Sequence, residues 1–250
     1  AGIDLGTQSI KVILYDYENK TIAAKSSCPL ELISANDGTR EQKTQWYDEA
    51  MLKCFKALDP ALLSQVKAAG VSGQQHGFVP LDAQGKALYN IKLWNDTSTV
   101  EECTILTKAL GGEAEVIKEV NNAMLPGFTA PKVLWLKRHK PELFAKLHYI
   151  MLPHDYVNYV LTGEYVNEAG DASGTALYNP VLSCWSKKVC DAVDPSLYNN
   201  MAPLVKSHEK SGTITSEAAA KFGLPAGIPV SSGGGDNMMG AIGTGTVEDG

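Results

Sequence analysis

The sequence lacks the features that mark several large classes of protein. No run of apolar residues is long enough to span a bilayer, and no basic segment followed by an apolar one stands at the start. Lysine and arginine number 22 against 28 acidic residues, and the net charge of -6 argues against a nucleic-acid partner or an anionic membrane. We therefore expect a globular protein of 250 residues with a sizeable core and neither kind of partner.

The chain has few cysteines, and their spacing is not that of a metal site. The chain has five cysteines, an odd number, and no CxxC pair: Cys28, Cys54, Cys103, Cys184 and Cys190. This usage argues against a zinc cluster or a disulfide framework and favours reduced thiols in a cytoplasmic protein.

The two best-known glycine-rich nucleotide motifs are also missing. The chain contains no GxxxxGK[ST], and no GxGxxG follows the first predicted strand. The first absence excludes a P-loop, and the second argues against a dinucleotide-binding unit.

The most distinctive stretch that is present is Ser231–Gly245, with three consecutive glycines followed by Asp236. Ile228–Ser232 reads as a short strand entering a tight turn, and Asn237–Gly243 as the start of a helix. A strand, a glycine turn and a helix N-terminus together can hold an anion or a reacting group. Asp236 either caps this helix or acts as a general base.

The N-terminus predicts a β-hairpin with a polar tip. A strand ending at Asp4 turns at Gly6, and a second strand covers Ile10–Asp16. Backbone N–H groups and the hydroxyls of Thr7 and Ser9 at such a tip can bind phosphate oxygens. Asp4 can hold Mg²⁺ through water, although a plain hairpin with an aspartate at its edge is the alternative.

A second polar loop follows the predicted buried strand Ala68–Gly73. Gln74, Gln75 and His76 lie between two glycines, at the kind of strand end where α/β folds bind ligands. Their donors and acceptors suit a polyhydroxyl ligand, and a turn of solvated polar residues is the alternative.

Helix dominates the middle of the chain. Asp96 ends the run Trp94-Asn95-Asp96 and can cap the helix predicted over Thr97–Leu110. We interpret Asp96–Asn179 as a helical insertion that builds one wall of a cleft. The glycine-rich segment Glu168–Thr175 within it either lines that cleft or only forms turns.

Several of these stretches together resemble the FGGY family of carbohydrate kinases. Asp4–Ser9 is similar to the family's first phosphate motif, and Gly127–His139 fits its first signature. Gly235–Asn237 resembles the loop that carries the catalytic aspartate, while Trp94–Asp96 and Leu161–Glu164 also fall where the family has such runs. The loop GQQHG is similar to that of the xylulose kinase branch, and the resemblance covers the whole chain.

The resemblance implies an α/β fold of the actin/hexokinase (ribonuclease H-like) type, with a mixed five-stranded sheet and a helical insertion. It implies transfer of the ATP γ-phosphoryl group to the 5-hydroxyl of D-xylulose, with Asp236 as the base and Mg²⁺ organised by Asp4. The implied sugar ligands are Gln75, His76, Asn237, Trp94 and Asp96. The residues implied to face the ATP phosphates are Asp4, Gly6, Thr7, Gln8 and Ser9.

Kinases of this family are about twice as long as this chain. We therefore expect residues 1–250 to be the N-terminal, sugar-binding domain, with a C-terminal nucleotide-binding domain absent. The alternatives are a kinase for another polyol such as ribulose, gluconate or glycerol, a sugar-binding module without catalysis, and an actin-like ATPase. A homodimer is also left open.

Overall fold

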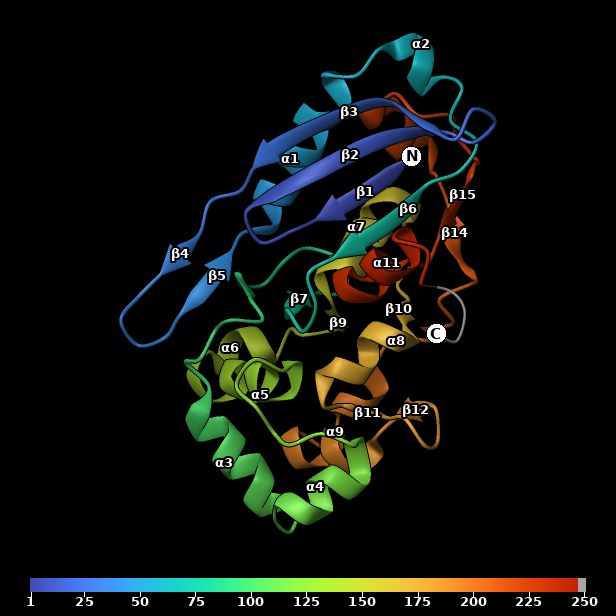
Figure 1. Cartoon of the computed structure of the whole chain (residues 1–250). Coiled ribbons are helices and arrows are strands. Elements are labelled where there is room, and N and C mark those ends of the chain that lie inside the picture. The colour runs from blue at the N-terminus through green and yellow to red at the C-terminus, as the bar shows by residue number, and fades with distance from the viewer. Residues whose placement is uncertain (247–250) are drawn as a thin grey trace.

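A five-stranded mixed sheet organises the structure, a computed structural model that describes residues 1–246 (Figure 1). The predicted end of the domain at Val247–Gly250 lies outside the described residues. The sheet has the order β16-β6-β1-β2-β3, and its strands are β1 (Gly2–Leu5), β2 (Ser9–Asp16), β3 (Thr21–Pro29), β6 (Gly70–Gly73) and β16 (Gly234–Gly235). The predicted mixed five-stranded sheet is thus confirmed.

The predicted hairpin is confirmed and extends into an antiparallel meander. β1 pairs with β2 from Gly2↔Ile13 to Leu5↔Ile10, and β2 continues to pair with β3. Alternate β2 residues are buried, as expected for a strand with one face on the core. β6 and β16 then add in parallel, so that β1, β6 and β16 end at the same edge.

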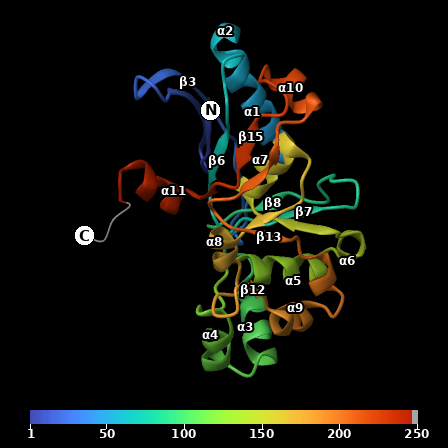
Figure 2. The same cartoon turned by 90° about the vertical axis from the view of Figure 1, so that its right-hand side faces the viewer.

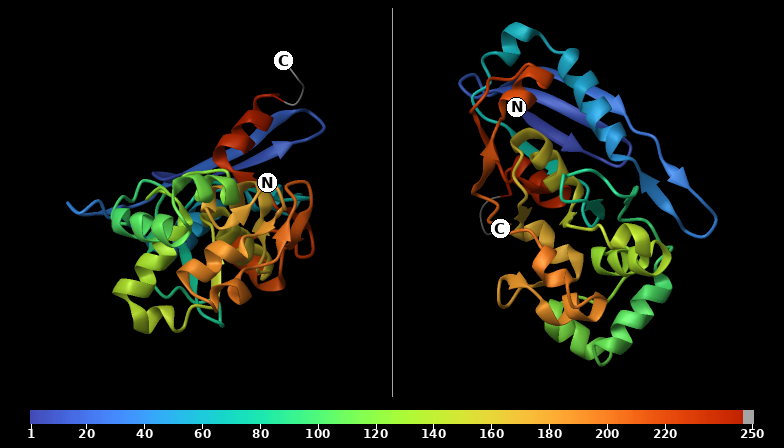
Figure 3. Two further views of the ribbon diagram at one scale, coloured as in Figure 1. Left: turned by 90° about the horizontal axis from the view of Figure 1, so that it is seen from below. Right: turned by 180° about the vertical axis from the view of Figure 1, so that it is seen from behind.

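Three helices cover one face of this sheet (Figures 2 and 3). They are α1 (Thr44–Lys56), α7 (Pro153–Thr162) and α10 (Ser216–Phe222). The apolar face predicted for α1 is buried, and Phe55 packs against Phe222 with ring centroids 5.2 Å apart. Helix α11 (Asp236–Gly243) lies on the opposite face, and none of its residues is buried.

A second hydrophobic core fills the lower part of Figure 1. Its main helices are α3 (Val100–Ala109), α4 (Glu113–Val120), α5 (Thr129–His139) and α9 (Lys187–Val193). The predicted insertion is present, but its bounds were wrong in two respects. α7 lies inside the range Asp96–Asn179 yet packs on the sheet, and the second core continues to Leu197. The apolar face of α7 decides this, because Val157 and Leu161 are fully buried against the sheet core.

The remaining elements are short. The short strands are β4 (Ile33–Ser34), β5 (Arg40–Gln42), β7 (Val79–Leu81), β8 (Ile91–Lys92), β9 (Tyr149–Met151), β10 (Asn167–Glu168), β11 (Tyr178–Asn179), β12 (Cys184–Trp185), β13 (Leu204–Val205), β14 (Lys210–Thr213) and β15 (Pro229–Ser231). The short helices are α2 (Pro60–Leu63), α6 (Pro141–Phe144) and α8 (Ala169–Ala172), with 3₁₀ turns at Ser173–Thr175 and Leu197–Asn200. None of the helices in residues 1–246 is long and apolar enough to cross a bilayer. All five cysteines are free thiols.

Candidate active site

The candidate site lies where the three parallel strands end. The hairpin tip follows β1, the loop from Gln74 to Gly77 follows β6, and Asp236 follows β16. Carboxyl ends of parallel strands are the usual ligand-binding edge of an α/β sheet. Three segments that are far apart in the sequence therefore meet at one edge.

The tight glycine turn before Asp236 is shorter than the sequence predicted. The strand predicted over Ile228–Ser232 is β15 (Pro229–Ser231), and two of the three glycines form the strand β16. Gly233 has a φ of 66°, and a Cβ there would lie 1.9 Å from the carbonyl oxygen of Val71. A Cβ on Gly235 would lie 2.4 Å from the amide nitrogen of Gln75. Only glycine permits both approaches, which bring the Asp236 loop onto β6 and its loop.

Five of the predicted site residues line one small cavity of about 210 Å³: Gln75, His76, Trp94, Asp236 and Asn237. Asn237 Nδ2 donates a hydrogen bond of 3.1 Å to Gln75 Oε1, which links the helix α11 to the β6 loop. The cavity is thus lined by one carboxyl group, two amides and two aromatic rings. It is smaller than a typical drug-sized pocket and suits a small polar ligand.

Asp236 is exposed at this cavity and is the first residue of α11, while Gly235 holds the cap position. Its Oδ1 accepts a hydrogen bond of 2.9 Å from the backbone N–H of Asn237. Partial burial, together with the negative charges of Asp4 and Asp171, raises the pKa of Asp236. A carboxylate with a raised pKa is better matched to accepting a proton near neutral pH.

His76 has an unusual backbone conformation, with a φ of 61° in the left-handed region. Its ring packs edge-on to Phe128, with centroids 5.0 Å apart, and a Cβ on Gly174 would lie 2.0 Å from its Cε1 atom. Burial lowers the pKa of His76, so that the neutral imidazole faces the cavity near neutral pH. A neutral imidazole can donate and accept hydrogen bonds, as a sugar ligand requires.

A chain of hydrogen bonds connects the cavity to the hairpin tip. Trp94 Nε1 donates to Thr7 Oγ1 at 3.0 Å, and Thr7 Oγ1 donates to Gln74 Oε1 at 3.0 Å. Gln74 is buried and donates in turn to the hydroxyl of Tyr47 at 2.8 Å. The sequence predicted that Gln74 offers its amide to a polyhydroxyl ligand together with Gln75 and His76, but the structure buries this amide against the hydroxyls of Thr7 and Tyr47.

The hairpin tip holds the residues implied to face phosphate. Gly6 N–H donates to the carbonyl of Ser9 at 3.0 Å, which closes the turn, and Gln8 is exposed. Asp4 is half-exposed on β1, 3.3 Å from Lys11 Nζ, and accepts a long hydrogen bond of 3.4 Å from the Ser72 hydroxyl. Within residues 1–246 no cluster of three metal-binding side chains is found.

A larger, mainly apolar cavity of about 380 Å³ lies beside Asp4, on the face of the sheet that carries α11. Ile3, Ile13, Val71 and Met239 are among its lining residues. It offers few hydrogen-bond partners, so it is a poor candidate for a polyhydroxyl ligand.

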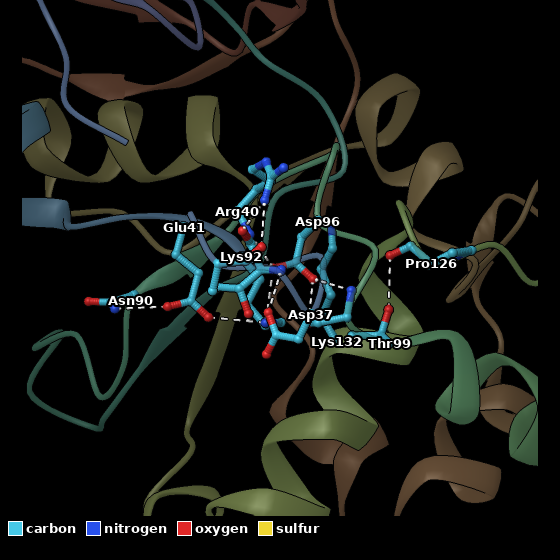
Figure 4. A network of polar contacts seen from close by, with 12 residues as sticks. Asp37, Arg40, Glu41, Asn90, Lys92, Asp96, Thr99, Pro126 and Lys132 are labelled. Atoms are coloured by element: carbon cyan, nitrogen blue, oxygen red, sulfur yellow. Dashed lines mark hydrogen bonds and ion pairs between the residues drawn. The ribbon is translucent and has the colours of Figure 1, made fainter. Parts of the chain in front are cut away.

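Asp96 is not brought to the small cavity, although we had predicted it as a sugar ligand. Its side chain is fully buried, 3.0 Å from Lys92 Nζ, which also lies 3.0 Å from Glu41 Oε1 (Figure 4). Asp96 also accepts hydrogen bonds from the backbone N–H groups of Arg40 and Ser98. Asp96 does not cap the following helix either, because Thr99 holds the N-cap position before α3. Buried carboxylates need such partners, and the burial of Asp96 was not visible from its neighbours in the sequence.

A buried ionic cluster behind the glycine turn was also missed. His154 is fully buried, with Nδ1 2.7 Å from Asp171 Oδ2 and Nε2 3.1 Å from Asp155 Oδ1. Burial lowers the pKa of His154, but the two carboxylates outweigh it and raise the pKa to about 9. A Cβ on Gly73 would lie 2.7 Å from the His154 Cβ, so the cluster packs directly under the end of β6. Asp171 in its glycine-rich segment was the only signal of this cluster in the sequence.

Comparison with known proteins fits this geometry. The sequence matches the N-terminal domain of the FGGY family of carbohydrate kinases over residues 1–243. The chain belongs to the FGGY family of carbohydrate kinases. This confirms the predicted fold class, α/β of the actin/hexokinase type.

Relatives within the FGGY family share the whole of this chain. A xylulose kinase from Haemophilus influenzae is 41% identical over 258 residues, which cover 100% of this chain and 52% of that protein. A xyloylose kinase from Brucella ovis superposes with a TM-score of 0.91 at 33% identity, over 100% of this chain and 51% of that one. A xylulose kinase from Rhodospirillum rubrum gives a TM-score of 0.90 at 26% identity, over 98% and 51%. The chain therefore spans about half the length of the FGGY proteins it matches.

Proposed function

We propose that the complete protein transfers the γ-phosphoryl group of ATP to the 5-hydroxyl of D-xylulose, and that this chain supplies the sugar site and the base. The observation that carries the proposal is the cavity of about 210 Å³ in which Asp236 faces Gln75, His76, Trp94 and Asn237. The similarity to xylulose kinases over the whole chain supports the choice of sugar. Residues 1–250 would then form the N-terminal domain, with the nucleotide-binding domain in the other half of the complete protein.

Asp236 accepts the proton of the attacking hydroxyl in this mechanism. Phosphoryl transfer requires an aligned hydroxyl, a base, and positive charge near the phosphates, and little covalent chemistry from the protein. The position of Asp236 at the first turn of α11, with its carboxylate exposed to the cavity, allows it to meet a bound hydroxyl directly.

The remaining cavity residues orient the sugar. Gln75 and Asn237 present amide groups that donate and accept, and His76 offers Nε2, because its Nδ1 is buried against Gly174. Trp94 closes the cavity with an apolar ring surface. His76 is a hydrogen-bonding ligand here rather than an acid, since the transition state already has a base.

ATP binds with its phosphates toward the hairpin tip. The hydroxyl of Thr7 is engaged with Trp94 and Gln74, so Thr7 and Gln8 present backbone N–H groups rather than the Thr7 side chain to the phosphates. This corrects the expected use of the Thr7 hydroxyl, while Gly6 serves to close the turn. Ser9 begins β2 beside them.

Mg²⁺ fits this edge as an ion held mainly by phosphate and water. Asp4 offers one half-exposed carboxylate, which is the kind of single oxygen contact that Mg²⁺ accepts in kinase sites. The ion would neutralise charge on the phosphates. Asp4 would place it, and the same carboxylate contributes to the raised pKa of Asp236.

Calorimetric titration of the chain and of the complete protein with D-xylulose tests the proposal. We expect saturable heat with D-xylulose and none with glycerol at the same concentrations, because the cavity presents several polar groups to a longer polyol. Saturation by ribulose or gluconate instead would assign another substrate. Binding of D-xylulose by the complete protein without any turnover of ATP would favour the sugar-binding module.

We also propose a location for the protein and the kinds of partner that it has. A cytoplasmic location agrees with five free thiols, and the excess of acidic side chains agrees with the absence of a nucleic-acid partner. Pairing of two copies stays a prediction, and sedimentation of the complete protein decides it.

A further inference from the structure

The segment Gly127–His139 was singled out in the sequence, but the proposed chemistry uses none of its residues. It consists of the whole helix α5 and the two residues before it, and a buried lysine lies in the first turn of this helix. Lys132 is fully buried, and its Nζ donates hydrogen bonds of 2.7 Å to the carbonyl of His76 and 2.6 Å to the carbonyl of Gly127. Thr129 Oγ1 donates to the same carbonyl of His76 at 3.2 Å.

A lysine in this position is costly. Burial depresses the pKa of Lys132 well below its usual range, and the nearby Asp96 only partly compensates. Figure 4 shows Lys132 close to the Lys92 and Asp96 pair. A hydrophobic side chain would fill this space without the desolvation penalty. The function of a lysine here must therefore lie in the hydrogen bonds that its amino group donates to the carbonyls of His76 and Gly127.

The carbonyl that Lys132 and Thr129 share belongs to the one cavity residue with a left-handed backbone. That conformation costs a non-glycine residue free energy and persists only when its surroundings enforce it. Two donors on one carbonyl fix the orientation of the peptide between His76 and Gly77. The imidazole ring itself packs between Gly174 and the ring of Phe128.

The second carbonyl bonded by Lys132, that of Gly127, lies next to the segment that carries Trp94. A Cβ on Gly127 would lie 2.6 Å from the carbonyl oxygen of Trp94, so these two backbones are in close contact. Through Gly127 and His76, the single amino group of Lys132 therefore links the segments that carry the two aromatic residues of the cavity, His76 and Trp94.

We propose that Lys132 and Thr129 are positioning residues of the sugar site, which hold the backbone of His76 left-handed and thereby aim its imidazole into the cavity. The role in sugar binding rests on the proposed function. The placement of the ring does not, and it can be measured without any sugar.

A double-mutant cycle in the complete protein tests whether Lys132 acts through His76. Lys132→Met should weaken D-xylulose binding about tenfold, with a smaller change in the KM for ATP. In a His76→Ala background the same substitution should weaken binding less than about twofold, because the ring it positions is gone. Full additivity of the two effects would overturn the proposal, since a purely structural role acts in either background.

Thr129 supplies a milder pair of variants in case Lys132→Met does not fold. Thr129→Val removes the hydroxyl and keeps the shape, and Thr129→Ser keeps the hydroxyl. We expect the valine variant to weaken sugar binding and the serine variant to restore most of it. Equal affinity in both variants would count against a role for this hydrogen bond.

Nuclear Overhauser contacts between the His76 ring and the Gly174 α-protons report the ring position without sugar. They should be present in the wild type and in Thr129→Ser, and weakened in Lys132→Met and Thr129→Val. Unchanged contacts in both of the latter variants would overturn the positioning role. If the wild type fails to bind D-xylulose, the proposed substrate is wrong, and these contacts still decide the inference.

Discussion

Replacing Asp236 with asparagine should lower kcat/KM for D-xylulose by roughly 10²–10⁴-fold and leave the free energy of unfolding nearly unchanged. The loss in rate follows from removing the group that accepts the hydroxyl proton. The stability should hold because the side chain is exposed and its one hydrogen bond is to the N–H of Asn237. Steady-state kinetics of the complete protein and urea unfolding of the same sample measure the two quantities.

Glu217 provides the matched control for Asp236. It is an exposed acidic residue in the first turn of α10, as Asp236 is in α11, but it lies far from the cavity. Glu217→Gln should change neither kinetics nor stability appreciably. Turnover close to wild type in Asp236→Asn would remove the assignment of the base and leave sugar binding as the function of the cavity.

Alkaline pH should destabilise the fold through His154. Its pKa is raised from about 6.5 in the unfolded chain to about 9 in the folded one. The stabilisation is therefore complete below pH 6.5 and is lost as the pH rises through 9. The shift is worth on the order of a few kcal/mol in the free energy of unfolding, and Asp155 in the same cluster, whose pKa is raised by burial to about 7, titrates in the same window. Urea unfolding at several pH values between 6 and 9.5 measures it.

Two histidine variants isolate this contribution. His154→Gln should abolish most of the fall in stability over this pH window. It should also be less stable at pH 6.5, because Asp155 and Asp171 remain buried without the imidazolium. His208→Gln, at an exposed position, should retain the pH dependence of the wild type. A wild-type stability that does not fall between pH 6.5 and 9 would show that His154 is not held charged by its neighbours.

Local patterns in the sequence predicted the parts of the site that local geometry determines. The hairpin around Gly6, the polar loop at Gln75 and His76, and the glycine turn before Asp236 each follow from neighbouring residues and recognisable strand ends. The same reasoning failed for Asp96, whose partners Lys92 and the backbone N–H of Arg40 come from two separate strands, β8 and β5. Its acidic side chain looks the same in the sequence whether it is buried or exposed.

The supporting residues of the site were harder to predict than the site itself. Lys132 bonds a carbonyl 56 positions away, and His154 contacts Asp171 across 17. Pairings of this kind depend on which faces of the helices pack together, and the type of a residue alone does not show which residues become its neighbours. Glycine was the exception, since Gly233 and Gly235 marked close backbone approaches before their neighbours were known.

The two hydrophobic cores have a consequence for how activity is lost on heating. The walls of the small cavity come from both cores, with Asp236 and Gln75 on the sheet side and Trp94 and His76 anchored to the helical side through Gly127 and Lys132. Regions with separate cores can open independently of one another. Partial melting of the helical core would then abolish the proposed activity while the sheet stays folded. Thermal inactivation should precede the loss of amide protection in β1 and β2.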